Sequence, residues 1–513
     1  MTTFILVAGA HTGGWIWHGT AERLEAAGAT VLPAALTGLD AGPGGGAAPP
    51  GTDLETHIAD VLALIDGADP STESRDLVLV GHDYGIHPVL GAAVRRPERI
   101  ARVVHLDTGI PRDGDPPLAL IQDAGLRESV TSSAGPLLPP PSADDWPRYG
   151  STAGVPPEAL ARLAARAVPQ PRATLTQPLR LTGSAPPPPT TGVFCTANGS
   201  SIALVESLVG LGDPRFAVLA APHVDFFDLA TGHWPMLSDP AGLADVLLRA
   251  AAGEGHHLVP REPGQQPAPQ RPFPVPVPEH ARERHGGVDL HLPADTQPPS
   301  PAVLLVHGGP VPAGVRPTPR DWPTFRGYAQ LLASRGVVGA VVDHRLHDIT
   351  DFARAADDVA AAVALLRADT RVDPDRVALW FFSAGGLLAT DWLAAPPPWL
   401  RCVALTYPVL DPLPNWGLSA TRFHPAPGPL PVVLTRVGRE HPAIATTVTA
   451  FLTAARTAAT PLDLVDAPEA HHAFESTDPP TVTRPAILAT TTALLRRLTA
   501  ATGPDVSPEP SPG

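Results

Sequence analysis

Three short stretches in the second half of the chain carry side chains that could perform acyl transfer. Ser383 lies in "ALWFFSAGG", where an apolar strand-like run turns sharply into a helix-like one and would expose the hydroxyl. Glu440 follows the run "PVVLTRVG", and His472 follows "PLDLVDA" in "PEAHHAF". In this order an acid can orient an imidazole, and the imidazole can deprotonate the serine. The pattern predicts Ser383 as nucleophile, His472 as base and Glu440 as the orienting acid.

Backbone donors for the same reaction are predicted at two turns. The stretch "LLVHGGP" places Gly308 and Gly309 directly after a buried strand, and paired glycines let N–H groups approach a substrate oxygen. The residue after the nucleophile, Ala384, would supply the second donor of an oxyanion hole. His307 precedes the glycines, and we interpret it as a support for this loop.

A turn of similar shape in the first half has a carboxylate at its centre. In "LVLVGHDYGIHP", Asp83 takes the place that a serine would occupy. A carboxylate needs no base to become nucleophilic, so it can attack a saturated carbon, and a His-activated water can hydrolyse the resulting alkyl ester. His233 lies in "LATGHWPMLSDP", after a further strand-like run. Backbone donors are predicted at Ala10 and Tyr84.

Alternating strand-like and helix-like runs must position these residues. Residues 1–255 and residues 285–502 each repeat this alternation, which predicts two α/β domains with mostly parallel, doubly wound sheets flanked by helices. The first domain contains an irregular Pro-rich insertion at about 108–190, predicted to form a cap. The Pro-rich stretch 256–284 is typical of a semi-rigid linker, and residues 503–513 of a disordered tail.

The composition excludes several other classes of function. A net charge of −15 argues against nonspecific nucleic-acid binding, and the absence of Lys excludes a Lys nucleophile or Schiff base. Cys195 and Cys402 lie far apart and give neither a disulfide framework nor a metal-binding spacing, so no metal or cofactor is predicted. No run approaches the ~18 apolar residues of a membrane span, and no signal peptide is recognisable at the N-terminus. We expect a cytoplasmic protein without nucleic-acid or membrane partners that acts on a small ester or alkyl substrate.

The second half resembles α/β-hydrolase-fold esterases of the dienelactone-hydrolase and carboxylesterase kind, over roughly residues 285–500. The matching motifs are "HGG", "SAGG" and "HHAF". The resemblance implies that His472, rather than His471, is the catalytic histidine. The family motif is Gly-x-Ser-x-Gly, and its first glycine is Phe381 here, so the turn is expected to be altered.

The first half resembles small α/β-hydrolases, over roughly residues 1–253. The stretch "LVAGAHTGGWIW" is similar to the opening of small esterases and hydroxynitrile lyases, with Ala8 in place of the usual histidine. The "GHDYG" turn is similar to the Asp elbow of haloalkane dehalogenases and epoxide hydrolases. The resemblance implies that His233 is the base. It also implies an acid after the strand "TGVFCTAN", but Asn198 stands there, and Asp107 at the end of "RVVHLD" is the alternative acid.

Two alternatives remain open from the sequence. The first domain is either an Asp-nucleophile hydrolase, built on Asp83, His233 and Asp107, or a degenerate site. The whole chain is either a hydrolase, with a serine esterase in its second domain, or a non-catalytic binding or scaffold protein with two hydrolase-like pockets.

Overall fold

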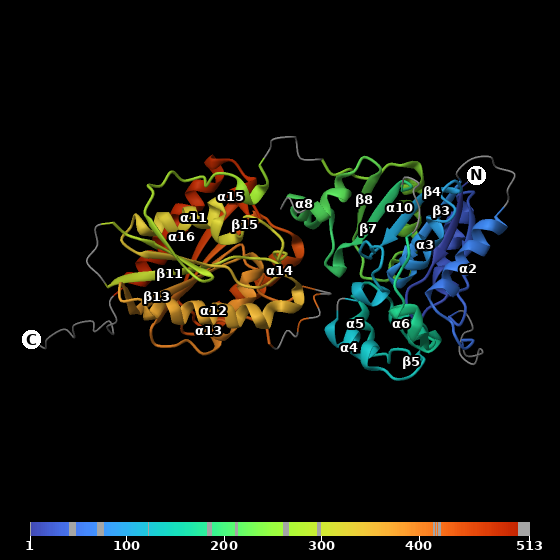
Figure 1. Ribbon diagram of the computed structural model, residues 1–513, viewed down its shortest axis with the longest axis horizontal. Coiled ribbons are helices and arrows are strands. Elements are labelled where there is room, and N and C mark those ends of the chain that lie inside the picture. The colour runs from blue at the N-terminus through green and yellow to red at the C-terminus, as the bar shows by residue number, and fades with distance from the viewer. Residues whose placement is uncertain are drawn as a thin grey trace, which may run out of the picture. The chain divides into compact units, whose positions relative to one another are not determined.

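The chain folds as two compact units, the first covering Met1–Gln265 and the second most of the chain from Gln266 onward. The computed structural model (Figure 1) describes residues 2–39, 48–68, 76–121, 123–181, 187–210, 214–259, 266–294, 299–413, 416, 418 and 422–500. Each unit is a sheet between layers of helices, as the alternating pattern predicts. None of the helices in these ranges has the length and apolar character needed to cross a membrane.

The sheet of the first unit has six parallel strands in the order β2-β1-β3-β4-β7-β8. Their bounds are β1 (Thr3–Val7), β2 (Thr30–Pro33), β3 (Leu77–His82), β4 (Ile100–Leu106), β7 (Thr190–Cys195) and β8 (Val224–Leu229). The central strand β3 is buried along its whole length because both faces of the sheet are covered. Its carboxyl end carries the Asp83 turn.

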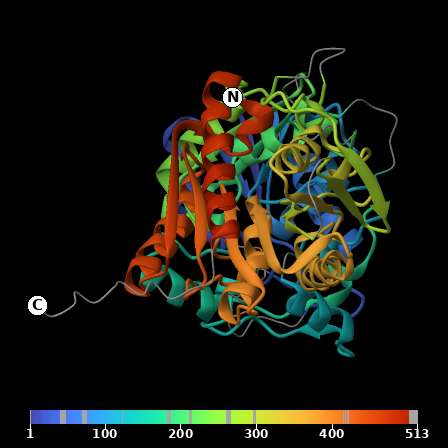
Figure 2. The same cartoon turned by 90° about the vertical axis from the view of Figure 1, so that its left-hand side faces the viewer.

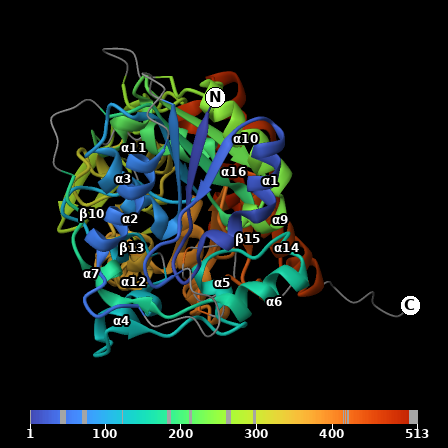
Figure 3. The same ribbon diagram turned by 90° about the vertical axis from the view of Figure 1, so that its right-hand side faces the viewer.

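Helices cover this sheet on two sides. Figure 3 shows α1 (His18–Ala26) and α10 (Pro240–Ala252) on one side of the strands, and α2 (Leu54–Gly67) and α3 (Ile86–Ala93) on the other. Alternate strand residues point to opposite faces, so the two sides have separate apolar cores. The sheet and its two cores hold the turn at the end of β3 rigidly.

The insertion between β4 and β7 is more regular than the sequence indicates. It contains α4 (Ala124–Ser132), β5 (Leu137–Leu138), α5 (Trp146–Tyr149), α6 (Pro157–Arg166), β6 (Gln170–Pro171) and α7 (Arg172–Thr176). Strands β5 and β6 form a small antiparallel ribbon. The many prolines obscured this pattern because they also begin helices, as at α6. After β7 follow α8 (Ile202–Gly210) and α9 (Pro235–Ser238).

The second unit has an eight-stranded sheet in the order β16-β15-β14-β13-β11-β12-β10-β9. The bounds are β9 (Ala281–His285), β10 (Val288–Leu292), β11 (Ser300–Val306), β12 (Val338–Val342), β13 (Val372–Phe382), β14 (Leu400–Thr406), β15 (Val432–Arg439) and β16 (Leu462–His471). Strand β10 pairs antiparallel with both β9 and β12, and the other strands are parallel. The predicted mostly parallel sheet is confirmed, with an antiparallel edge.

The helices of the second unit again form two layers. They are α11 (Pro323–Ala333), α12 (Phe352–Ala368), α13 (Thr390–Ala394), α14 (Pro442–Thr457), α15 (Phe474–Thr477) and α16 (Pro480–Thr499). Figure 1 shows α11 and α16 on one side of the strands and α12 and α13 on the other. Figure 2 shows the long C-terminal helix α16 running beside the last strands, with which it is in contact.

Short 3₁₀ helices occur at many turns of both units. They are η1 (Gly14–Trp17), η2 (Asp83–Gly85), η3 (Pro117–Leu120), η4 (Thr196–Asn198), η5 (Pro214–Ala220), η6 (Ala268–Gln270), η7 (Pro319–Asp321), η8 (Ile349–Asp351) and η9 (Ser383–Ala389). Two of them, η2 and η9, begin at the predicted nucleophiles.

The division between the two units falls within the stretch 256–284 that the sequence predicts as a linker. The second unit begins at Gln266, and β9 begins at Ala281. Within this stretch the ring of Phe273 packs against Tyr328 on α11, with ring centroids 5.0 Å apart. Proline removes backbone donors but still packs its ring, so a Pro-rich segment can cover a core without showing periodicity. The predicted tail 503–513 lies outside the described residues.

Candidate active site

The turn after β13 presents Ser383 in a strained conformation. Its φ is 52°, in the left-handed region that residues other than glycine rarely adopt. Gly385 is required next to it, because a Cβ there would lie 2.7 Å from the carbonyl oxygen of His307. The backbone of β11 therefore runs closely behind the turn and holds the serine outward.

Ser383, His472 and Glu440 form a continuous chain of hydrogen bonds. Ser383 Oγ lies 2.6 Å from His472 Nε2, and His472 Nδ1 lies 2.8 Å from Glu440 Oε2. The other carboxylate oxygen of Glu440 accepts the N–H of His441 at 2.8 Å. The structure brings together all three residues that the sequence predicts for this site, each at the carboxyl end of a different strand.

The neighbouring His471 is held away from the serine. Its N–H and its Nδ1 both bind the carboxylate of Asp478, at 2.7 Å each. The resemblance to esterases implies His472 as the base, and the geometry agrees with that choice.

Phe381 fits in place of the usual glycine of the elbow because the helix that follows Ser383 differs in type from the one that follows Asp83. In the first unit a Cβ at Gly81 would lie 2.5 Å from Cα of Ile86, where α3 begins. In the second unit the segment after the nucleophile is 3₁₀-helical as far as Ala389, and it carries Gly386 five residues after Phe381. A 3₁₀ helix rises about 2.0 Å per residue instead of 1.5 Å, which moves the chain away from the strand. Phe381 is fully buried there, and the serine still reaches His472.

The predicted oxyanion loop lies against the nucleophile through Gly308. A Cβ on Gly308 would lie 2.7 Å from Cβ of Ser383, so only glycine allows this approach. His307 is buried, and its ring stacks on His344 at 3.7 Å between centroids. Burial, together with the neighbouring His344, holds the pKa of His307 well below its usual value. A neutral, packed imidazole agrees with a supporting role for His307. The donor roles of Gly309 and Ala384 stay predictions.

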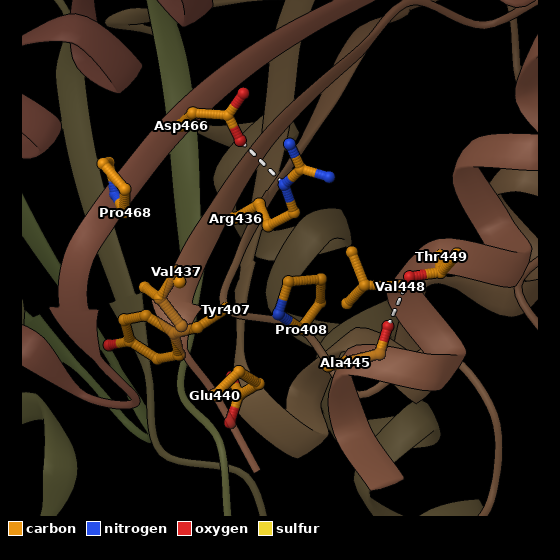
Figure 4. A pocket seen from close by; sticks show the side chains of 11 residues that line it. Tyr407, Pro408, Arg436, Val437, Glu440, Ala445, Val448, Thr449, Asp466 and Pro468 are labelled. Atoms are coloured by element: carbon orange, nitrogen blue, oxygen red, sulfur yellow. Dashed lines mark hydrogen bonds and ion pairs between the residues drawn. The ribbon is translucent and has the colours of Figure 1, made fainter. Parts of the chain in front are cut away.

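A cavity of about 510 Å³ opens beside the acid of this site. Figure 4 shows Arg436 and Asp466 paired at one end and Glu440 and Tyr407 at the other. The lining does not include Ser383 or His472. The cavity therefore lies beside Glu440 and does not mark the position of a reacting bond.

In the first unit Asp83 occupies the corresponding strained turn. Its φ is 49°, and its Oδ2 accepts the N–H of Ala10 at 3.2 Å. Gly85 faces the carbonyl oxygens of Val7 and Ala8, each of which would lie 2.6 Å from a Cβ. The predicted donor Ala10 therefore binds the carboxylate of the elbow itself, leaving Oδ1 as the oxygen available to a substrate.

His233 binds the displaced acid. Its Nδ1 lies 2.6 Å from Oδ2 of Asp107, while Oδ1 of Asp107 accepts the N–H of Cys195 at 3.1 Å. Burial lowers the pKa of His233, but the bond to Asp107 and the charges of Asp107 and Asp83 outweigh it and raise the pKa above its usual value. Because Asp107 binds Nδ1, Nε2 is the ring nitrogen that this acid leaves unoccupied.

Asn198 takes the position at which a conventional acid is expected and supports Asp107 instead. Its Nδ2 donates to Asp107 Oδ2 at 2.5 Å, and its Oδ1 accepts the N–H of Ser151 at 2.6 Å. The N–H of His233 donates to the carbonyl oxygen of Ser151 at 2.7 Å. The cap segment is therefore tied to both the acid and the base.

The side chains of two tyrosines near Asp83 have different surroundings. The Tyr84 side chain is buried, with its hydroxyl 2.7 Å from Nδ1 of His57 on α2, so it points into the core behind the elbow. Tyr149 of the cap lies with its hydroxyl 3.4 Å from Nε2 of His11. Burial, with the charge of Asp83 adding to it, raises the pKa of Tyr149 to about 12. The Tyr84 side chain thus faces the core, and the backbone donor role of Tyr84 stays a prediction.

Sequence reasoning missed three polar residues next to the two sites. They are His11, the partner of Tyr149; Asn198 as the support of Asp107; and Glu475, which accepts the hydroxyls of Tyr328 and Tyr407 at 2.6 and 2.8 Å. His11 lies within "LVAGAHTGGWIW" and Asn198 ends "TGVFCTAN", but neither stretch indicates the partner, because each of the three residues meets its partner across a long sequence separation. The only signal for Glu475 was its place three residues after His472.

Comparison with known proteins agrees with this architecture. Residues 4–246 match the sequence model of the family described as "Alpha/beta hydrolase family", and residues 288–394 match the family described as "BD-FAE". A "Carbendazim hydrolyzing esterase" of Nocardioides sp. (strain SG-4G) is 40% identical over 124 residues, which are 24% of this chain and 49% of that esterase. The chain thus spans about half the length of this curated relative.

Solved structures with similar folds are esterases and related hydrolases. The apo form of Thermogutta terrifontis esterase 2 is 20% identical, with a TM-score of 0.36, over 44% of this chain and 97% of its own. An extracellular α/β-hydrolase from a Paenibacillus species, described as sharing homology with Tobacco Salicylic Acid Binding Protein 2, is 21% identical, with a TM-score of 0.38, over 49% and 99%. The methylesterase MES16 from Arabidopsis is 19% identical, with a TM-score of 0.37, over 49% and 100%. The predicted fold class is confirmed: both units are mostly parallel sheets flanked by helices, and residues 4–246 match the α/β-hydrolase family model.

Proposed function

We propose that the second unit is a serine esterase that cleaves small carboxylic esters or lactones through an acyl-enzyme. The observation that carries the proposal is the chain of hydrogen bonds from Ser383 through His472 to Glu440, at 2.6 and 2.8 Å. His472 takes the proton of Ser383 as the hydroxyl attacks the acyl carbon, and returns it to the leaving alcohol. Backbone N–H groups at Gly309 and Ala384 bind the developing oxyanion.

A fluorophosphonate probe tests this proposal, since it reacts with an activated serine. Labelling of the full chain is expected, and it is lost in Ser383→Ala and in His472→Ala. The matched control is His471→Ala, because His471 binds Asp478 instead of the serine and should keep labelling. The absence of labelling, together with no hydrolysis of p-nitrophenyl acetate, would favour the rival function of a non-catalytic binding or scaffold protein.

The substrate class can be narrowed with a panel of esters. It should include short p-nitrophenyl esters, small lactones, methyl esters and carbendazim, because a relative of part of this chain is described as an esterase that hydrolyses carbendazim. Rates are compared between the wild type and Ser383→Ala, so that any activity of the first unit is recognised as the part that persists.

We propose a second activity for the first unit, in which Asp83 displaces a leaving group from a saturated carbon. The Ala10 N–H binds one oxygen of Asp83. His233, hydrogen-bonded to Asp107, is the base for hydrolysis of the alkyl ester. Asp83 attacks carbon, the leaving group departs with its electron pair, and water activated by His233 then releases the product. The hydroxyl of Tyr84 is bound to His57 in the core, so this residue, next to Asp83, offers no side-chain donor to a halide leaving group. An oxygen leaving group, protonated by Tyr149, fits better.

A single turnover in heavy-oxygen water tests the first unit. An active Asp83 takes the heavy oxygen into its own carboxylate, which mass spectrometry of the peptide detects. Asp83→Asn is the matched negative control, and Ser383→Ala keeps the second unit silent during the measurement. No incorporation across epoxide, halide and ester substrates would favour a degenerate site.

A further inference from the structure

A second carboxyl group, Glu475, is buried beside the serine site and has no ion-pair partner among the described residues. Its side chain belongs to α15 and is 4% exposed. Oε1 accepts the hydroxyl of Tyr328 at 2.6 Å, and Oε2 accepts that of Tyr407 at 2.8 Å. Burial raises the pKa of Glu475, so keeping this group in the core costs folding free energy.

Tyr407 connects this carboxyl group to the base of the triad. Its ring packs on the imidazole of His472, with centroids 4.8 Å apart. Tyr407 follows β14 with a φ of 37°, in the strained left-handed region, and its N–H donates to the carbonyl oxygen of Thr435 at 2.9 Å. Figure 4 shows the Tyr407 hydroxyl pointing away from the middle of the cavity. The backbone is thus held so that the ring contacts His472 while the hydroxyl binds Glu475.

The hydrogen-bond pattern is that of a carboxylate rather than a carboxylic acid. Each oxygen of Glu475 accepts a bond from a tyrosine hydroxyl, which leaves neither oxygen with an obvious donor role. The groups that face it are Tyr328 from α11, Tyr407 after β14 and His472 before α15, and Glu440 faces Tyr407 from the end of β15. Of these groups His472 is the one that can become cationic, while the Arg271 guanidinium binds the neighbouring carbonyl oxygen of Ser476 at 2.6 Å.

We propose that Glu475 is a positioning residue of the serine site, which through Tyr407 orients the His472 imidazole and stabilises its protonated form during acyl transfer. The inference rests on the proposed esterase function of the second unit. The imidazole gains a proton when Ser383 attacks, and a fixed negative charge in a site of low polarity favours that state. Glu440 acts directly on Nδ1, and Glu475 acts from behind the Tyr407 ring.

Glu475→Gln tests the charge while keeping the shape of the side chain. The maximal rate of p-nitrophenyl acetate hydrolysis is expected to fall about tenfold with little change in KM, since the loss falls on the transition state. The acidic limb of the pH–rate profile is expected to move to lower pH by about half to one unit, because the protonated imidazole loses a stabilising charge.

Two tyrosine variants separate positioning from general damage to the core. Tyr407→Phe keeps the ring on His472 and loses the bond to Glu475, so it should change the rate and the acidic limb in the same direction as Glu475→Gln. Tyr328→Phe loses an equivalent bond to Glu475, but Tyr328 has no contact with His472 and packs on Trp380 and Phe382. Tyr328→Phe should lower the melting temperature about as much as Tyr407→Phe does, but it should lower the rate of ester hydrolysis less.

A nitrogen NMR titration of His472 gives a readout that does not depend on esterase activity. The resonance is identified by its loss in His472→Gln, and its titration midpoint is compared in the full-length wild type and Glu475→Gln. If the His472 midpoint is lower in Glu475→Gln but the protein hydrolyses no ester, the esterase proposal is wrong and the coupling between Glu475 and His472 is supported. An unchanged midpoint and acidic limb, with only a lower melting temperature, would overturn the inference. If Glu475→Gln fails to fold, the same comparison on Tyr407→Phe decides it.

Discussion

The carboxylate of Asp107 lies 2.6 Å from Nδ1 of His233, although β7 runs between the strand that ends at this acid and the strand that precedes this histidine. Asn198, at the end of β7, fills the intervening space and donates to the same carboxylate oxygen at 2.5 Å. The first unit therefore keeps an acid–base pair with its acid moved by one strand. The amide is part of that arrangement, because it supplies a donor where a second carboxylate would repel.

Asn198→Asp is expected to destabilise the first unit, since it places two carboxylates within hydrogen-bonding distance of each other. The cost in unfolding free energy should be about 1–3 kcal/mol near neutral pH and smaller at about pH 5, where one carboxyl group takes up a proton and becomes a donor. Urea unfolding at the two pH values measures it. A cost that does not depend on pH would show that the amide contributes shape alone.

Asp107→Asn is expected to change stability in a pH-dependent way through His233. The raised folded-state pKa of His233 stabilises the folded protein below the ordinary histidine pKa, and this contribution disappears as the pH rises through the raised value. Removing the acid should therefore cost more unfolding free energy at about pH 5.5 than at about pH 8.5. Chemical unfolding followed by tryptophan fluorescence is the measurement. Equal costs at both pH values would contradict the assigned cause of the shift.

Glu440→Gln should leave the fold intact and impair the proposed esterase. The amide still fills the space beside His472, but it does not stabilise a protonated imidazole, so kcat should fall by about 10²–10⁴-fold with a small effect on KM. Steady-state kinetics with p-nitrophenyl acetate measures the loss. The control is Glu469→Gln, which removes an exposed carboxylate paired with Arg439 and should keep the rate within about twofold.

Both elbows should lose stability when the residue two positions before the predicted nucleophile changes size, the first on enlargement and the second on truncation. Gly81→Ala places a methyl group 2.5 Å from backbone atoms of α3 and should cost about 1–3 kcal/mol of unfolding free energy. Phe381→Ala opens a cavity in a fully buried site and should cost about 3–5 kcal/mol. Thermal unfolding of both variants tests this. A faster esterase in Phe381→Ala, without loss of stability, would mean that Phe381 strains the turn.

The arrangement of the candidate site in the second unit was largely predictable because it depends on local patterns. Ser383, Glu440 and His472 each follow an apolar strand, and the carboxyl ends of parallel strands meet at one edge of a sheet, so their convergence follows from strand order alone. The same reasoning places Asp83 and His233 together. The packing of Phe273 against α11 was not predicted, because Pro-rich segments pack without a periodic signal.

What the sequence by itself determined is the α/β architecture, the two nucleophile turns and the residues most able to react there. Only the tertiary structure decided how each turn is supported: Phe381 tolerated beside a 3₁₀ helix, Asn198 bridging to Asp107, and Glu475 shared by two tyrosines. The physical reason is that propensity and periodicity act between near neighbours in the chain. Hydrogen bonds and close packing act between neighbours in space, and folding brings those together from distant elements.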